Sequence, residues 1–109
     1  MTKYSAGDLL LLQFPQTSGA HGSLRPALVV VDTGDLDVLV ARVTRQMHGT
    51  AHDVIISEWR GAGLLAPSIV RLHKLATLEK SIVQRKLGCL QAADRSAVAN
   101  VLTQIFGSW

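Results

Sequence analysis

One stretch of the sequence decides how the rest of the chain can fold, and it reads Phe14-Pro15-Gln16-Thr17-Ser18-Gly19-Ala20-His21-Gly22-Ser23-Leu24-Arg25-Pro26-Ala27-Leu28-Val29-Val30-Val31. The pattern is typical of a strand end, a polar loop that contains glycine, and a second, buried strand. Pro26 fixes its own φ angle and restricts Arg25 to an extended conformation, so the guanidinium group leaves the chain at a defined place. An arginine held in this way suits the binding of phosphate or carboxylate. Taken alone, the segment favours a simpler interpretation, a surface arginine that packs on its own proline.

The composition predicts one domain that covers residues 1–109. A chain of 109 residues, 48% of them hydrophobic, is large enough for a single modest core. Its apolar runs are far shorter than the roughly 20 residues of a membrane span, and its first five residues lack the apolar segment of a secretory signal. Cys89 is the single cysteine. It excludes an internal disulfide, favours a reducing cytoplasm as the location, and is expected to be a small core residue rather than a nucleophile.

The net charge of +3 is unevenly distributed along the chain. Residues 1–40 contain two basic and four acidic side chains, whereas residues 41–109 contain nine and four. A basic half suits a polyanionic partner, although many proteins share this asymmetry.

Apolar runs and alternation predict six strands and one helix. The strands are expected at residues 9–14, 25–31, 36–44, 53–56, 69–78 and 82–90. One helical turn is expected over Glu58–Ala62. Apolar residues from Ala97 to Ile105 recur at helical spacing, with Asp94 in the first turn and Gly107 at the end. The pattern predicts an α+β fold that is mainly β, in which a C-terminal helix closes a small curved antiparallel sheet or barrel.

The predicted hairpin places two polar side chains at the same rim. In an antiparallel pair the end of one strand lies beside the start of the other, so Arg25 and Thr44 become neighbours. Together with Arg45, Arg71 and His73 they would combine phosphate-binding groups, a hydroxyl and one group that titrates near neutral pH. Such a set suits phosphodiester chemistry without a metal. The alternative is a basic rim that binds a polyanion and does not react with it.

Other reaction classes find little support in the sequence. His48 and His52 are four residues apart, but the segment between them is expected to be a loop and no third ligand is near, so a metal site is disfavoured. Taken singly, His73 is more simply interpreted as a partly buried histidine bonded to the backbone, and His21 as an exposed loop residue without a function. No paired carboxylates, phosphate-binding loop or catalytic triad is present.

Several short motifs occur in an order and spacing that resemble one family. They are Gly7-Asp8 before an apolar strand, Phe14-Pro15-x-Thr17, Arg25-Pro26-Ala27-Leu28-Val29, a strand ending in Thr44, Gly63-Leu64, Pro67-Ser68-Ile69-Val70-Arg71, Lys74-Leu75-Ala76-Thr77-Leu78 and Lys86-Leu87-Gly88-x-Leu90. Together they resemble the MazF/PemK toxins of bacterial type II toxin–antitoxin modules, and the likeness extends from about Gly7 to the final helix.

The resemblance implies an SH3-like curved sheet, a homodimer and an enzyme that needs no cofactor. Members typically cleave single-stranded RNA, often mRNA, at short sequences without a metal. The 2′-hydroxyl attacks the adjacent phosphate and leaves a 2′,3′-cyclic phosphate and a 5′-hydroxyl. A cognate antitoxin blocks the site with a disordered segment that orders on binding. The alternative function is a relative that binds RNA, antitoxin or gyrase without cleaving RNA.

The resemblance also assigns catalytic residues. Arg25 and Thr44 match the usual catalytic pair, and Arg45 stands where a serine commonly follows the threonine. In one branch of the family an arginine and an aspartate two residues apart take part. Here Arg71 matches the arginine, but His73 occupies the aspartate position.

That same branch has a histidine in its first loop, which His21 matches only with a gap. Because arginine is a poor general base, we expect His73 or His21 to accept the 2′-hydroxyl proton. Arg25 and Arg71 would then stabilise the developing charge, and Thr44 would position the phosphate.

The resemblance also implies that bases are recognised by the loops around the groove, here residues 16–24 and 45–52. The candidate RNA-binding residues there are Thr17, His21, Ser23, Arg45 and Gln46. Trp59 and Leu64 are candidates for exposed apolar contacts in a dimer.

Overall fold

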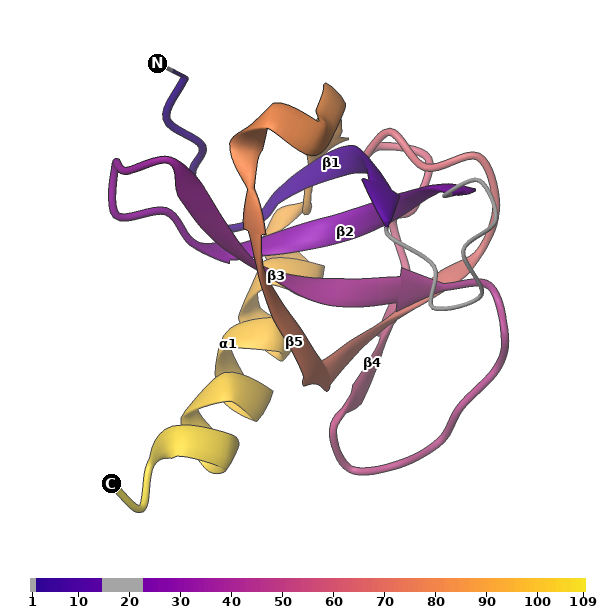
Figure 1. The fold of residues 1–109 in the computed structure, drawn as a ribbon. Helices are drawn as coiled ribbons and strands as arrows, with labels where there is room; N and C mark the ends of the chain where they lie inside the picture. Colours follow the sequence, from indigo (N-terminus) through magenta and orange to yellow (C-terminus); the bar gives the residue numbers. More distant parts are fainter. Residues whose placement is uncertain (1, 15–22) are drawn as a thin grey trace.

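Six antiparallel strands form one strongly curved sheet in the computed structural model, which describes residues 2–14 and 23–109. The sheet order is β4-β5-β3-β2-β1-β6. The elements are β1 (Asp8–Phe14), β2 (Ser23–Val31), β3 (Asp37–Thr44), β4 (Asp53–Ile56), β5 (Ser68–Glu79), a 3₁₀ turn η1 (Lys80–Ile82), β6 (Val83–Cys89) and α1 (Ala92–Phe106). The helix packs across one side of the sheet (Figure 1). The prediction of a mainly β fold with a C-terminal helix is confirmed.

The central strands are buried on both faces because the sheet encloses two apolar clusters. Neighbouring residues of β1, Leu9 and Leu10, belong to different clusters, and so do Leu28 and Ala27 of β2. Since successive side chains of a strand point to opposite faces, one cluster lies on each side of the sheet. The first cluster includes Val98 of α1, and the second is closed by residues around η1.

An irregularity in β5 divides this long strand into two parts. Ala41 of β3 is opposite Leu75, but the next residue, Arg42, is opposite Arg71. Residues 72–74 therefore have no partner in β3, and the strand bends sharply there, as Figure 1 shows. The N-terminal part of β5 also pairs with β4, where Arg71 is opposite Asp53.

The segment between β4 and β5 contains the turn that was predicted over Glu58–Ala62. A hydrogen bond from the Ala62 N–H to the Glu58 oxygen closes it, which is the i+4 to i bond of a single helical turn. Both carboxylate oxygens of the buried Asp94 accept backbone N–H groups from this turn, from Ser57 at 3.0 Å and from Glu58 at 2.8 Å. The first turn of α1 therefore fixes the segment.

Three expectations about exposure were wrong. Leu64 is buried and Trp59 is partly buried against the core, because the turn packs on the sheet. Gly63 (φ +90°) lies so close to β6 that a Cβ there would be 2.1 Å from the Leu87 oxygen. Cys89, by contrast, is exposed, because it lies on the edge strand β6.

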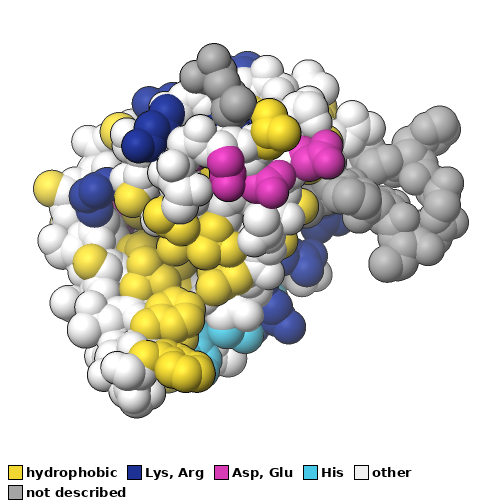
Figure 2. Space-filling model, turned by 60° about the vertical axis from the view of Figure 1, so that its left-hand side comes forward, with side chains coloured by type: hydrophobic (Ala, Val, Ile, Leu, Met, Phe, Trp, Pro, Cys, Tyr) yellow, Lys and Arg dark blue, Asp and Glu magenta, His cyan; other side chains and the backbone are white. Residues whose placement is uncertain are grey.

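Figure 2 shows one face on which hydrophobic side chains form a continuous area, bordered by a row of acidic side chains. Within the described part of the chain, no helix is long and apolar enough to cross a membrane.

Candidate functional site

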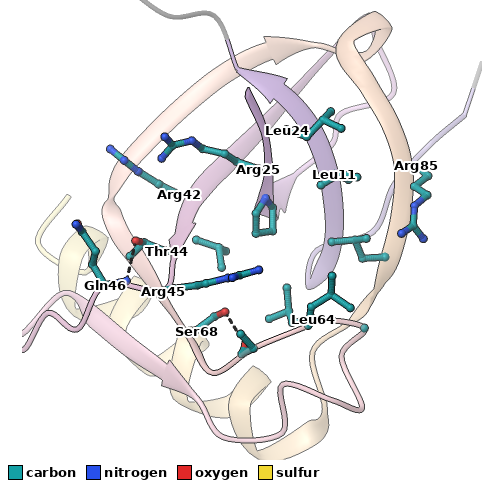
Figure 3. A pocket seen from close by; sticks show the side chains of 16 residues that line it. Leu11, Leu24, Arg25, Arg42, Thr44, Arg45, Gln46, Leu64, Ser68 and Arg85 are labelled. Carbon is teal, nitrogen blue, oxygen red and sulfur yellow. Dashed lines mark hydrogen bonds between the residues drawn. The ribbon is translucent and has the colours of Figure 1, made fainter. Parts of the chain in front are cut away.

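A pocket of about 630 Å³ opens at one end of the sheet, where β2, β3 and β6 come together with the turn before β5. Its walls are formed by Leu11, Leu24, Arg25, Pro26, Arg42, Val43, Thr44, Arg45, Gln46, Gly63, Leu64, Leu65, Ala66, Ser68, Arg85 and Leu87. Figure 3 shows these side chains, with Arg25, Arg42 and Arg45 toward one side of the view and Arg85, on β6, toward the other.

The hairpin of β2 and β3 brings Arg25 and Thr44 to this pocket. Ala27 is opposite Arg42 in the hairpin register, and continuing that antiparallel register by two residues brings Arg25 level with Thr44. The Arg25 Nε donates to the Ser23 Oγ at 3.1 Å. The two residues that the sequence placed at one rim therefore line the same pocket.

The Thr44 hydroxyl is oriented by the chain that follows it. Its Oγ1 accepts the backbone N–H of Gln46 at 3.1 Å (Figure 3). A hydroxyl has one proton to donate and two lone pairs. Because one lone pair is occupied in this way, the O–H remains suited to donate to an anionic oxygen in the pocket.

The floor of the pocket is apolar and closely packed. It includes Leu11 of β1, Val43 of β3 and Leu87 of β6. The turn residue Leu64 completes this surface, and the neighbouring Gly63 allows the turn to approach the Leu87 backbone. A planar apolar group such as a nucleobase is the kind of ligand that such a floor suits.

The polar part of the pocket is strongly cationic. Four arginines line it, Arg25, Arg42, Arg45 and Arg85, and no acidic residue is among the described residues of the lining. Within residues 2–14 and 23–109 none of the four forms an ion pair. Unpaired guanidinium groups around a common space favour binding of phosphate.

Two of these arginines were missed by the sequence reasoning. Arg42 lies two residues before Thr44 on the same strand and therefore on the same face, so alternation could have identified it. Arg85 reaches the pocket because β6 pairs with β1, where Arg85 is opposite Leu11. Nothing local in the sequence indicates that pairing.

Arg71 and His73 do not line the pocket but belong to a second cluster at the bend of β5. The Arg71 Nε donates to the Asp53 Oδ1 at 2.9 Å, and its Nη2 is 3.4 Å from the His73 Nε2. The rings of His73 and His52 lie 5.3 Å apart. The expected cluster of five residues is thus divided in two, because the bend directs Arg71 toward Asp53 of β4.

The second cluster has perturbed ionisation. Burial of the Asp53 carboxyl opposes its ionisation, but hydrogen bonds from Thr50 and Arg71 outweigh this and lower the pKa of Asp53 from 3.8 to about 2. Partial desolvation and the positive charge of Arg71 lower the pKa of His73 below its ordinary value of 6.5, against the opposite effect of Asp53. At neutral pH the cluster therefore contains a carboxylate, a guanidinium and a neutral imidazole.

The remaining sequence candidates are placed as follows. Arg45 and Gln46 line the pocket, whereas Ser23 lies beside it and binds Arg25. Thr17 and His21 lie outside the described residues. Among the described residues, no group of three or more histidine, cysteine or acidic side chains could hold a metal ion.

The sequence of this chain matches one family of known proteins. Residues 5–106 match the family described as PemK-like, MazF-like toxin of type II toxin–antitoxin system. The match covers nearly the whole chain, so the chain belongs to this family of toxins. The resemblance seen in the sequence motifs is confirmed. A search of curated proteins found no match.

Solved structures show the same fold at low sequence identity. The Mycobacterium tuberculosis toxin MazF-mt6 is 23% identical, with a TM-score of 0.74, and the match covers 92% of this chain and 96% of that one. A MazE–MazF structure from Deinococcus radiodurans is 22% identical, with a TM-score of 0.78 and all of both chains covered. An endoribonuclease in complex with its cognate antitoxin, from a mycobacterial species, is 17% identical, with a TM-score of 0.73 and coverage of 93% and 92%.

Proposed function

We propose that this toxin is an endoribonuclease that cleaves single-stranded RNA, mRNA in particular, without a metal ion. The products are a 2′,3′-cyclic phosphate and a 5′-hydroxyl. The observation on which this depends is the pocket itself. Four arginines without acidic partners surround a space next to the Thr44 hydroxyl, in a chain that belongs to a toxin family.

The charge of the pocket fits the transition state of this reaction. Attack of the 2′-oxygen on phosphorus forms a crowded intermediate with additional negative charge on the non-bridging oxygens, and the bond to the 5′-oxygen then breaks. Fixed cationic donors around the phosphate lower the barrier because they are already oriented. In this proposal Arg25 and Arg45 bind the phosphate and Thr44 donates to one of its oxygens.

Proton transfer requires a group that the described residues of the pocket lining do not include. The 2′-hydroxyl must lose a proton as it attacks, and the 5′-oxygen must gain one as it leaves. His21 and His73 are the candidate acceptors from the sequence. The His73 Nε2 faces Arg71 and the residue does not line the pocket, which favours His21 for this step.

The antitoxin is proposed to inhibit by occupying the same pocket. The cationic walls and the apolar floor suit a disordered acidic segment with apolar side chains that orders on binding. The mycobacterial endoribonuclease was solved in complex with its cognate antitoxin, and the Deinococcus radiodurans structure is of MazE–MazF. We further propose a cytoplasmic homodimer, and the continuous hydrophobic area of Figure 2 is a surface that a second copy could cover.

The test is cleavage of a long single-stranded RNA by purified protein in EDTA, followed by mapping of the ends. We expect discrete cuts with cyclic phosphate ends, and none when the nucleotide 5′ to each cut is 2′-deoxy. Arg25→Ala should lower the rate by about 10²–10³-fold. Arg60→Ala is the matched control. The substitution removes the same charge, but Arg60 stacks on Trp59 outside the pocket lining.

A second candidate function is favoured by one observation. The described residues of the pocket lining include no histidine, cysteine or carboxyl side chain, which suits a protein that binds RNA, antitoxin or gyrase without cleaving RNA. Tight binding of RNA without cuts by the wild-type protein would establish this alternative, and cuts that persist unchanged in Arg25→Ala would contradict the proposed site.

A further inference from the structure

A buried carboxylate at the first residue of β4 joins two separate parts of the chain. The Asp53 side chain is only 2% exposed, and its Oδ1 accepts from the Arg71 Nε at 2.9 Å. Its Oδ2 accepts from both the backbone N–H and the hydroxyl of Thr50, at 3.0 and 2.8 Å. The ionised carboxylate accepts all three donors at once, and these bonds fix its position in the structure.

The loop that Thr50 belongs to begins inside the pocket. Residues 45–52 connect β3 to β4, and the first two of them, Arg45 and Gln46, line the pocket. Thr44 is bonded to this end of the loop through the Gln46 N–H. The near end of the loop therefore determines where one arginine and the Thr44 hydroxyl lie.

The far end of the same loop is tied to the bend of β5. Besides the two bonds from Thr50 to Asp53, the Asp53 N–H donates to the Thr50 oxygen at 3.2 Å, and the Leu72 N–H donates to the His52 oxygen at 3.0 Å. Between the two ends the loop is open. Met47 is exposed, and a Cβ at Gly49 would meet nothing within 4 Å. The conformation of the loop thus depends on how its ends are fixed.

We propose that Asp53 is a positioning residue for the pocket, which acts by holding Thr50 and thereby limits the positions of Arg45 and Gln46 relative to bound RNA. Arg71 then serves as the counter-ion of Asp53 and not as a ligand of the phosphate. The inference rests on the proposed function. Its physical basis is that groups which stabilise a transition state must be held to within a fraction of an ångström, so that a displacement of about 1 Å can cost about 10²-fold in rate.

The test uses a substitution that removes the side-chain bonds of Thr50 but keeps its backbone bonds and the ion pair. Thr50→Val removes the hydroxyl donor and preserves the shape and β-branching of the side chain, while Asp53 and Arg71 remain paired. We expect kcat/KM for RNA cleavage to fall about tenfold. Thr33→Val, at an exposed threonine after β2, is the matched control and should retain wild-type activity.

Two further measurements separate positioning from stability. The melting temperature of Thr50→Val should stay close to that of the wild type. Amide hydrogen exchange should accelerate in residues 45–49 and at His52, whose N–H loses the Thr50 Oγ1 that accepts it at 3.3 Å, and not in the strands. Asp53→Asn, which keeps the shape but loses the charge, should change exchange in the same residues to a larger extent. If it fails to fold, Thr50→Val still decides the question.

The outcomes distinguish this inference from the proposed function. If the wild type cuts RNA and Thr50→Val cuts equally well, Asp53 does not position the pocket. If the wild type does not cut RNA, the proposed function is wrong, and hydrogen exchange alone decides whether Thr50 and Asp53 hold the loop. Unchanged exchange at residues 45–49 would then overturn the inference as well.

Discussion

The pocket and the bend of β5 use arginine in opposite ways. In the pocket, Arg25, Arg42, Arg45 and Arg85 surround a shared space, and the described lining contains no carboxylate to neutralise them. At the bend, Arg71 is 16% exposed and is paired at 2.9 Å with the buried Asp53. An arginine without an internal partner is available to an external anion, whereas an arginine on a buried carboxylate is part of the fold. The two groups of arginines differ in the side chains that surround them and not in residue type.

Removal of an arginine should therefore change the stability of the protein far more at the bend than in the pocket. The loss at the bend is the largest effect on stability that we expect. Arg71→Ala leaves the Asp53 carboxylate buried without its counter-ion, which should cost about 3 kcal/mol of unfolding free energy. Arg25→Ala removes an exposed side chain and should change the unfolding free energy by less than about 0.5 kcal/mol. Urea unfolding of both variants, followed by circular dichroism, measures this. Equal losses in the two variants would remove the distinction between the regions.

The sequence could predict the pocket in part because that part is local. Arg25 and Thr44 meet through a hairpin of consecutive strands, so alternation and antiparallel pairing suffice to bring them together. The strands and the helix follow from apolar runs and from helical spacing. The observed bounds of β4 agree with the expected ones, and the helix has Asp94 in its first turn and ends before Gly107, as expected.

The parts that the sequence could not give depend on contacts between distant segments. Arg85 enters the pocket only because β6 pairs with β1. Asp53 becomes the partner of Arg71 because β5 bends after that residue, and no alternation rule gives the position of a bend. The burial of Leu64 likewise follows from the close approach of Gly63 to the β6 backbone. Resemblance to a family supplied roles for Arg71 and His73, but the immediate neighbours of these residues come only from the structure.

A smaller effect should appear in the salt dependence of RNA binding. It tests whether Arg42 and Arg85, which the sequence did not identify, bind an external anion as the other pocket arginines are proposed to do. Arg42→Ala and Arg85→Ala should each weaken binding of a single-stranded oligonucleotide and reduce the slope of log affinity against log salt by about 0.7. Fluorescence anisotropy with a 2′-deoxy oligonucleotide, which cannot be cleaved, measures the slope between low and high salt. Arg60→Ala serves again as the control and should leave the slope unchanged. A slope that responds to Arg60 as much as to Arg42 would mean that the whole basic surface, and not the pocket, binds the nucleic acid.

The smallest effect should be the pH dependence that His73 gives to stability. Because the pKa of His73 is lowered in the folded protein, both the folded and the unfolded chain hold this imidazole neutral well above pH 6.5, and its contribution to stability there does not change with pH. As the pH falls below 6.5, the unfolded chain takes up a proton that the folded chain resists, and stability is lost. Asp53, whose pKa is about 2, stays charged throughout this range. His73→Gln should therefore lose less melting temperature than the wild type between pH 7.5 and pH 5.5.

The same variant decides whether His73 belongs to the bend or to the chemistry. Its Nε2 lies beside the Arg71 Nη2, so we expect that nitrogen to accept a hydrogen bond from Arg71 rather than a proton from RNA. The acidic limb of the pH–rate profile should consequently survive in His73→Gln and His73→Ala with an unchanged apparent pKa. Loss of that limb, at an unaltered melting temperature, would assign proton transfer to His73. It would also mean that the bend of β5 supplies a reacting group to the pocket, and the two regions would then be one active site.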